Sequence, residues 1–262
     1  MIEAVPPLSG LLELAVRAAH LVSPEILAVF VNSSQQIERK PDGSVVTQAD
    51  KNAEARIRAL FAESAGLRYP VLGEELGDDT VGSRYRWTVD PIDGTLSYSR
   101  GIPNFGTLIA FEDAAAAHAL VGVIHLPAFG ETYAAARGSG ATCNGNAIRV
   151  APPRPLDDCL VAVSNLRAFQ TAQLEEGYAR LSQAVPQLRG ISDCWSHAMA
   201  SRGALDVVVE FGLNRWDIAA TEVIVEEAGG ACLVRPSRVP RKFDAVLGNA
   251  QSVEAVARLI GF

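Results

Sequence analysis

The chain has 262 residues, of which 48% are hydrophobic and 20% are charged, as is usual for a soluble globular enzyme. Its formal net charge of -7 excludes an overall basic surface for nucleic acid or for an anionic membrane. An acidic protein that acts on an anionic substrate needs a local source of positive charge, and bound metal ions can provide it.

The first part of the chain begins with helices and continues with strands. Apolar residues between Leu8 and Val22 recur at steps of three and four, which predicts a helix. A turn at residues 41–43 and an extended piece at 45–46 precede a helix over 48–64 that Thr47 caps. Short β-type runs then follow without long helices between them, which predicts a largely antiparallel or mixed sheet. They cover residues 69–72, 84–89, 107–111, 120–125 and 132–135.

A proline-rich segment at residues 151–155 is the predicted boundary between two parts of the chain. Residues 1–150 would form an N-terminal α+β part, and residues 151–262 a C-terminal α/β part. In the second part helices and strands alternate, which is typical of α/β structure. The strands are expected at 160–163, 205–210 and 245–247, and the helices at 171–184, at 195–202, at 217–228 before Gly229-Gly230, and at the end of the chain.

The cysteines and the N-terminus are typical of a cytoplasmic protein. The four cysteines form no C-x-x-C pair, which argues against a zinc knuckle or a disulfide framework and favours a reducing compartment: Cys143, Cys159, Cys194 and Cys232. Glu3 and two prolines stand where a signal peptide would have a basic flank, so none is expected. No apolar run is expected to reach the length of a membrane span. We therefore predict neither a nucleic-acid nor a membrane partner.

The stretch W-T-V-D-P-I-D-G-T, residues 87–95, carries the strongest chemical signal. A predicted strand leads into a turn with two carboxylates, Asp90 and Asp93, which are oxygen ligands of the kind that Mg²⁺ prefers. The amides of Gly94 and Thr95 then face a phosphate if a short helix starts there. A plain turn in which Asp93 caps a helix fits these residues equally well. The spacing differs from the D-x-D-x-T of phosphatases that form an aspartyl-phosphate, and this favours water as the nucleophile.

Three other segments place acidic side chains at the ends of predicted elements. The G-E-E at residues 73–75 follows a strand, where paired acids favour a nearby cation, although a solvated acidic turn that continues into Asp78 and Asp79 is the alternative and fits Glu75 better than Glu74. Asp217 opens a helix and, taken alone, is most simply a cap. Asp50 stands three residues after Thr47, as in a capping box, or it accepts a hydrogen bond from a hydroxyl that orients a water.

Together these segments resemble the inositol monophosphatase family over nearly the whole chain. The matching motifs are K-x-D-x-S-x-V-T-x-A-D ending at Asp50, G-E-E, W-x-x-D-P-I-D-G-T, and W-D-x-A-A followed by E-A-G-G from Trp216 to Gly230. The resemblance implies an α/β fold, a layered αβαβα sandwich of the inositol monophosphatase and fructose-1,6-bisphosphatase type. It also implies activation by Mg²⁺, sensitivity to lithium and a homodimer. The sequence departs from the family at residues 96–98, where we expect different packing.

The resemblance also implies roles for individual residues. Two or three Mg²⁺ ions would be held by five oxygen donors: Glu74, Asp90, the carbonyl of Ile92, Asp93 and Asp217. The catalytic residues would orient the attacking water and help to remove its proton in an in-line displacement at the phosphorus: Glu74, Thr95 and Asp50. The phosphate and the substrate would contact the same region: Asp93, Gly94, Thr95 and Asp217.

The substrate is predicted from the segment S-D-C-W-S-H, residues 192–197, which is similar to the histidinol-phosphatase branch of the family. Histidinol phosphate carries an ammonium and an imidazole group, and the carboxylates of Asp193 and Glu210 would bind them. A helix cap at Asp193 is the structural alternative, and Trp195 and His197 are expected to be packed helix residues. The alternative substrates are inositol 1-phosphate and, with less support, fructose 1,6-bisphosphate and 3′-phosphoadenosine 5′-phosphate. The alternative from a different functional class is that the protein is an inactive regulatory module that binds metal.

Overall fold

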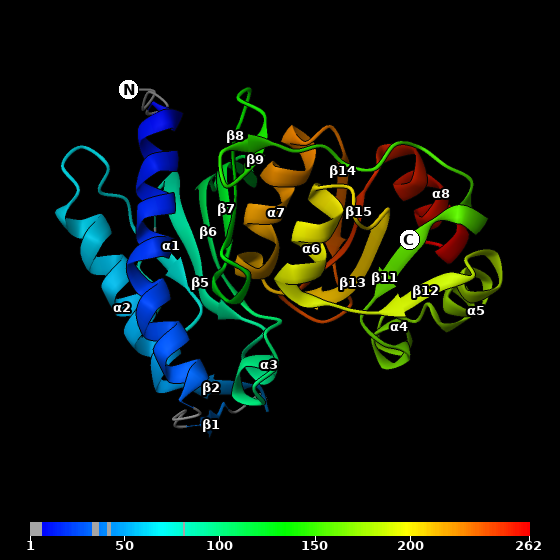
Figure 1. Ribbon diagram of the computed structural model, residues 1–262, viewed down its shortest axis with the longest axis horizontal. Helices are drawn as coiled ribbons and strands as arrows, with labels where there is room; N and C mark the ends of the chain where they lie inside the picture. The colour runs from blue at the N-terminus through cyan, green and yellow to red at the C-terminus, as the bar shows by residue number, and fades with distance from the viewer. Residues whose placement is uncertain (1–6, 33–36, 41–42, 81) are drawn as a thin grey trace.

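A computed structural model describes residues 7–32, 37–40, 43–80 and 82–262, and it confirms the predicted layered architecture. Figure 1 shows five layers across the molecule in the order helices, sheet, helices, sheet, helices. The predicted turn at residues 41–43 lies mostly outside the described residues, as does Glu3. The division into parts 1–150 and 151–262 stays a prediction, although each part contributes one of the two large sheets.

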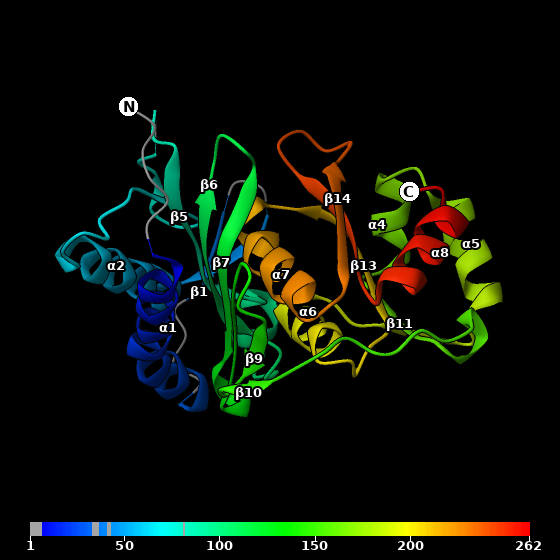
Figure 2. The same cartoon turned by 90° about the horizontal axis from the view of Figure 1, so that it is seen from above.

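The helices form the two outer layers and the central layer. Figure 2 shows α1 and α2 on one side of the first sheet, α6 and α7 between the sheets, and α4, α5 and α8 outside the second sheet. Their bounds are α1 Leu8–Val31, α2 Gln48–Glu63, α3 Thr95–Ser99, α4 Leu166–Thr171, α5 Glu175–Ala184, α6 Asp193–Ser201, α7 Arg215–Glu227 and α8 Ala250–Ile260.

The first large sheet is mixed, as predicted, because β3 runs parallel to β5 while the other pairs are antiparallel. Its strand order is β10-β9-β8-β7-β6-β5-β3-β4, and β1 and β2 form a separate hairpin. The bounds are β1 Ile37–Arg39, β2 Val45–Thr47, β3 Val71–Gly73, β4 Gly77–Asp78, β5 Tyr85–Asp93, β6 Gly106–Asp113, β7 His118–Leu126, β8 Glu131–Ala136, β9 Ala141–Cys143 and β10 Asn146–Ala147.

The second sheet has the strand order β12-β11-β13-β15-β14. Its strands are β11 Leu160–Val163, β12 Gln187–Gly190, β13 Val207–Leu213, β14 Ala231–Pro236 and β15 Phe243–Gly248. The edge strands β12 and β14 were not predicted, although β14 begins with the apolar run Ala231-Cys232-Leu233-Val234. The helix predicted over 171–184 is α5, which begins later, at Glu175; the separate helix α4 before it was not predicted, and Gln173 between them has a positive φ of 57°.

Helices cover the first sheet on both faces, which explains why every residue of β6 is buried. Successive side chains of a strand point to opposite faces. Ile109 and Phe111 therefore join the core beneath α1 and α2, whereas Leu108 and Ala110 join the core around α6 and α7. The central helices are thus held between two hydrophobic layers, which gives the first turns of α6 and α7 defined positions.

Helix α1 requires a correction, because its 24 residues and mean hydropathy of 1.6 satisfy the length and composition of a membrane span. The expectation that no apolar run reaches that length is therefore wrong. The helix packs one face on the first sheet through side chains that include Leu11, Leu14 and Val22. A core helix of a folded domain passes the same test, and this packing accounts for the hydrophobic character of that face.

Gly122 in β7 faces the backbone of α7, and a Cβ atom there would overlap the carbonyl oxygen of Ala220. A backbone cannot rotate away as a side chain can, so we expect Gly122→Ala to destabilise the protein by about 1–3 kcal/mol. Urea unfolding measures this difference. The control is Gly10→Ala in α1, where the new Cβ would meet only Leu67 at 3.8 Å and stability should not fall. Equal stability of Gly122→Ala and the parent would contradict the close approach of α7.

Candidate active site

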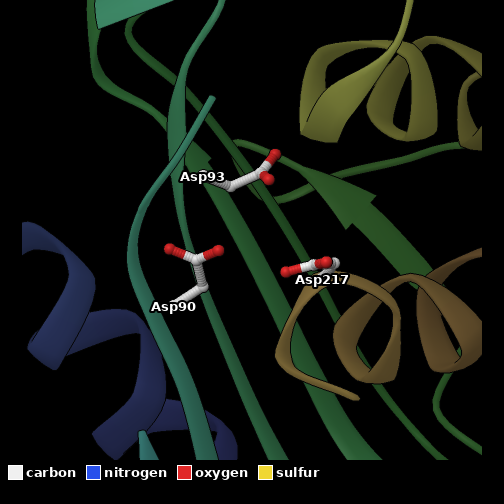
Figure 3. Close-up of side chains that lie close together, drawn as sticks. All are labelled: Asp90, Asp93 and Asp217. Atoms are coloured by element: carbon white, nitrogen blue, oxygen red, sulfur yellow. The ribbon is translucent and has the colours of Figure 1, made fainter. Parts of the chain in front are cut away.

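Carboxylates from two distant segments meet where β5 ends and α7 begins. One oxygen each from Asp90, Asp93 and Asp217 lies within 4.8 Å of the others. Figure 3 shows the three side chains around a common space, two of them from β5 and one from the start of α7. Negative charges this close repel one another strongly unless protons or cations neutralise them.

An irregularity in β5 brings Asp90 and Asp93 to the same side. Side chains three residues apart in a regular strand point to opposite faces. The pairing with β6 shifts register between these two residues, since Asp90 pairs with Leu108 and Asp93 pairs with Gly106. The intervening Pro91 is held in place because its carbonyl accepts a hydrogen bond of 2.8 Å from the Thr107 hydroxyl. A bulge of this kind redirects a side chain toward a site.

Asp217 acts as part of a helix cap and also lies at the carboxylate cluster. Its Oδ2 accepts a hydrogen bond of 2.7 Å from the backbone N–H of Asn214, which completes a capping box at the start of α7. One of the two oxygens is therefore used by the cap, and the other has no hydrogen bond in the described residues. The two interpretations of this residue are compatible.

Asp50 shows the same combination at the start of α2. Its Oδ2 accepts hydrogen bonds from the backbone and hydroxyl of Thr47, at 2.8 and 2.5 Å. Its Oδ1 lies 3.2 Å from the hydroxyl of Thr95, which also lies 2.8 Å from the carbonyl oxygen of Ile92. Burial raises the pKa of Asp50 to about 6, although the hydrogen bonds from Thr47 oppose the shift. The hydroxyl of Thr95 thus links Asp50 to the turn after Asp90.

Glu74 and Glu75 follow β3 and share one lysine. Lys40 Nζ lies 2.8 Å from Glu74 Oε1 and 2.7 Å from Glu75 Oε1. The expectation of a solvated turn at Glu75 is wrong, because its side chain is only 3% exposed. Burial raises the pKa of Glu75 to about 7, against the effect of the hydrogen bond from Lys40. The charge of Glu74 also raises the pKa of Asp90, after burial, which connects this pair to the cluster.

The electrostatics of the cluster fit a divalent cation. Burial raises the pKa of Asp90 well above its usual value, and neighbouring acidic side chains, Glu74 first, raise it further. Burial and nearby carboxylates also raise the pKa of Asp93 well above its usual value. Burial also raises the pKa of Asp217 to about 7. All of these groups are oxygen donors, and a hard cation such as Mg²⁺ would relieve their repulsion.

A pocket of about 520 Å³ opens beside the cluster, and its lining includes Glu74, Gly94, Thr95 and Asp193. Glu74 also lines a second pocket of about 650 Å³, where the positive charges of Lys40 and three further side chains gather: Arg215, Arg241 and Lys242. Lys40 and Arg215 are paired with glutamates, whereas Arg241 and Lys242 add positive charge to this lining. A small anionic molecule therefore has room and charge complementarity beside the carboxylates.

Asp193 and Glu210 have different surroundings. Asp193 is the first residue of α6, and its N-cap is Ser192, so the expected alternative of a cap at Asp193 does not apply. Glu210 is buried and lies outside the lining of the 520 Å³ pocket. His197 is a packed residue of α6, as predicted, and Trp195 is partly buried.

The sequence model that describes the inositol monophosphatase family matches residues 8–258. The chain belongs to the inositol monophosphatase family. A histidinol-phosphatase of Chlorobaculum parvum is 36% identical over 230 residues, which are 87% of this chain and 85% of that protein. An inositol-1-monophosphatase of Mesorhizobium japonicum is 34% identical over 235 residues, or 85% of this chain and 84% of that protein.

The crystal structure of the extragenic suppressor protein suhB from Bartonella henselae has a TM-score of 0.85 to this chain at 28% identity, and the match covers 96% of this chain and 98% of that one. The family, the sandwich type and the enzyme class predicted from sequence are therefore confirmed. As an inositol monophosphatase family member, the protein is a phosphatase that acts on phosphate monoesters of small molecules.

In this inositol monophosphatase family member, the predicted site residues other than Glu210 lie around the cluster or its pocket. The sequence interpretation missed one contact, the hydrogen bond of 2.6 Å from the backbone N–H of Cys194 to Asp93 Oδ2. This contact could not be predicted from sequence, because its donor is a backbone N–H and no residue type indicates where such a donor will point. It also missed Lys40 as a partner of Glu74, although the K-x-D motif contains this lysine.

Proposed function

We propose that the protein is a Mg²⁺-dependent phosphatase whose substrate is histidinol phosphate. The observation that carries the proposal is the convergence of Asp90, Asp93 and Asp217 beside a pocket that Asp193 lines. These carboxylates, with Glu74 and the carbonyl of Ile92, would hold two or three Mg²⁺ ions. A cytoplasmic location, a homodimer and sensitivity to lithium belong to the same proposal.

Bound Mg²⁺ supplies positive charge for the phosphate and lowers the pKa of a nearby water. Thr95 and Asp50 would orient that water, because the Thr95 hydroxyl can donate to Asp50 Oδ1 while its oxygen accepts from the water. With a pKa of about 6, Asp50 accepts a proton more readily at neutral pH than an ordinary aspartate does. Glu74 would assist by contacting the same water, and the amides of Gly94 and Thr95 would bind phosphate oxygens.

Asp193 is the residue that we propose recognises the substrate. Its pKa is raised to about 6 by burial, and by the charge of Glu210. An ammonium group in the pocket would relieve that unfavourable environment, whereas a polyol would do so less. The relatives named histidinol-phosphatase support this choice. Inositol 1-phosphate is the second candidate, because relatives of similar identity are named inositol-1-monophosphatase.

A phosphate-release panel with Mg²⁺ tests the proposal. We expect the highest kcat/KM with histidinol phosphate, followed by inositol 1-phosphate, and little release from fructose 1,6-bisphosphate or 3′-phosphoadenosine 5′-phosphate. Preference for inositol 1-phosphate would overturn the substrate and leave the metal site standing. Absence of Mg²⁺-dependent release from all four compounds would instead favour a metal-binding regulatory module.

A further inference from the structure

Glu54 in α2 contacts the turn over residues 74–76, which joins β3 to β4 and carries Glu74. The side chain of Glu54 is fully buried. Its Oε2 accepts a hydrogen bond of 2.7 Å from the backbone N–H of Glu75, and its Oε1 accepts one of 3.2 Å from the backbone N–H of Leu76. The N–H of Glu75 belongs to the peptide bond that joins it to Glu74. The carboxylate of Glu54 therefore holds the backbone from which the Glu74 side chain extends.

The charge of Glu54 is balanced by Arg58, one turn further along α2. Arg58 Nε donates a hydrogen bond of 2.8 Å to Glu54 Oε1. The same guanidinium donates to the carbonyl oxygen of Gly77 at 2.5 Å and to Asp79 Oδ2 at 3.2 Å. A buried carboxylate is tolerated where its charge is paired and its oxygens are hydrogen-bonded. Glu54 and Arg58 together thus attach the turn and the strand after it to α2.

Gly73, the glycine of the G-E-E motif, leaves room for this carboxylate. A Cβ atom on Gly73 would overlap Glu54 Oε1 and would lie 2.8 Å from Arg58 Nη2. Gly73 does not have a positive φ, so its backbone conformation is one that alanine also adopts. The close approach of the Glu54 carboxylate is therefore the feature that excludes a side chain at this position.

Helix α2 also carries Asp50, four residues before Glu54, and residues four apart lie on the same face of a helix. Asp50 is buried, and its Oδ1 lies 3.2 Å from the Thr95 hydroxyl. One face of α2 thus reaches the candidate site twice, directly through Asp50 and indirectly through Glu54. This arrangement fixes the position of Glu74 relative to the Asp50–Thr95 contact.

We propose that Glu54 is a positioning residue, which holds the 74–76 turn so that the Glu74 carboxylate is directed at Mg²⁺. Glu54 acts through the backbone of Glu75 and Leu76 and does not bind the metal itself. Without these contacts the turn would have to be ordered when the metal binds, and this ordering would cost affinity. The proposal rests on the function proposed above, because it takes Glu74 as a metal ligand.

Two substitutions remove the contact from opposite sides. Glu54→Ala deletes the carboxylate, whereas Gly73→Ala keeps Glu54 but places a methyl group where its carboxylate lies. We measure the apparent Kd for Mg²⁺ by titration calorimetry without substrate. We also measure the rate as a function of Mg²⁺ concentration with the phosphate monoester that the parent hydrolyses fastest. In both variants we expect Mg²⁺ binding to weaken at least about tenfold, while kcat at saturating Mg²⁺ stays within about threefold of the parent.

Asp206→Ala is the matched control, because Asp206 is also a buried carboxylate with a backbone partner and an arginine partner. It accepts a hydrogen bond of 2.7 Å from the backbone N–H of Leu160 and pairs with Arg154 at 3.0 Å. It stands just before β13 in the second sheet, whereas the 74–76 turn belongs to the first sheet. Its loss should lower the melting temperature without weakening Mg²⁺ binding. An equal weakening in this control would overturn the proposal, because general destabilisation would then explain the effect.

Unchanged Mg²⁺ binding in Gly73→Ala, or in a folded Glu54→Ala, would also overturn the proposal. A loss of kcat that saturating Mg²⁺ does not restore would do the same, since it would place Glu54 outside metal binding. If Glu54→Ala does not fold, Gly73→Ala decides alone, because its backbone accommodates alanine. Failure of the proposed metal site is distinguishable, since the parent itself would then bind no Mg²⁺.

Discussion

Asp93→Asn is expected to lower kcat at least about 100-fold while the fold is kept. The asparagine side chain retains an oxygen that can accept the hydrogen bond from the backbone N–H of Cys194, so local structure has little reason to change. The substitution removes the negative charge with which this side chain would hold Mg²⁺. Because burial, and then repulsion by neighbouring carboxylates, raises the pKa of Asp93, the metal-free variant should be at least as stable as the parent.

Initial rates with histidinol phosphate at saturating Mg²⁺, together with thermal unfolding in a chelator, measure the two effects. Asp113→Asn is the matched control, because Asp113 pairs with Tyr85 at the opposite end of the β5–β6 pair and forms an ion pair with Arg84. That variant should keep the parental kcat. A parental rate in Asp93→Asn would refute the proposed metal site, whereas a loss of rate in both variants would point to general damage.

Mg²⁺ is expected to stabilise the protein, and more strongly as the pH rises. The folded pKa of Asp217 is about 7, above its ordinary value of 3.8, so the protonated form is favoured in the metal-free protein. The stability that protonated Asp217 contributes to the folded protein is fully present below about pH 4 and is lost as the pH rises through about 7. The pKa values of Asp90 and Asp93 are raised in the same direction. Metal ions would replace these protons and restore the lost stability.

Thermal unfolding with Mg²⁺ and with a chelator, at about pH 5 and about pH 8, tests this expectation. A ligand at a hundred times its Kd stabilises the folded state by about 2.7 kcal/mol, which for a chain of this size raises the melting temperature by roughly 5–10 °C. We expect a shift of that order at the higher pH and a much smaller one at the lower pH. Asp217→Asn should reduce the difference. An equal shift at both pH values, or none, would argue against a metal held by these carboxylates.

The D-P-I-D-G-T stretch could be interpreted from sequence because its chemistry is local. A strand followed by proline, glycine and two carboxylates predicts a turn with oxygen ligands, and the structure adds the register shift that turns Asp90 and Asp93 to one side. The capping box at Asp50 was likewise visible as spacing, whereas Asp217 was predicted only as a helix cap and the structure adds its box with Asn214. The spacing alone did not predict that Asp50 and Asp217 lie near the cluster, because a cap accounts for each residue without any distant partner.

Non-local surroundings decided the rest. Glu75 was expected in solvent because its neighbours in sequence are acidic, yet Lys40 from the β1–β2 hairpin buries it in an ion pair. Glu210 was predicted to contact the substrate, and the structure adds that His197 and the backbone N–H of Asp193 contact its two oxygens.

The sequence by itself therefore determined the family, the layered fold and which acidic side chains could carry the chemistry, since these depend on periodicity and short motifs. Only the tertiary structure decided which of these side chains share a space, which are buried, and which are already engaged by other protein groups. The physical reason is that repulsion, burial and hydrogen bonding act over a few ångströms in space, whereas Asp93 and Asp217 lie in different halves of the chain.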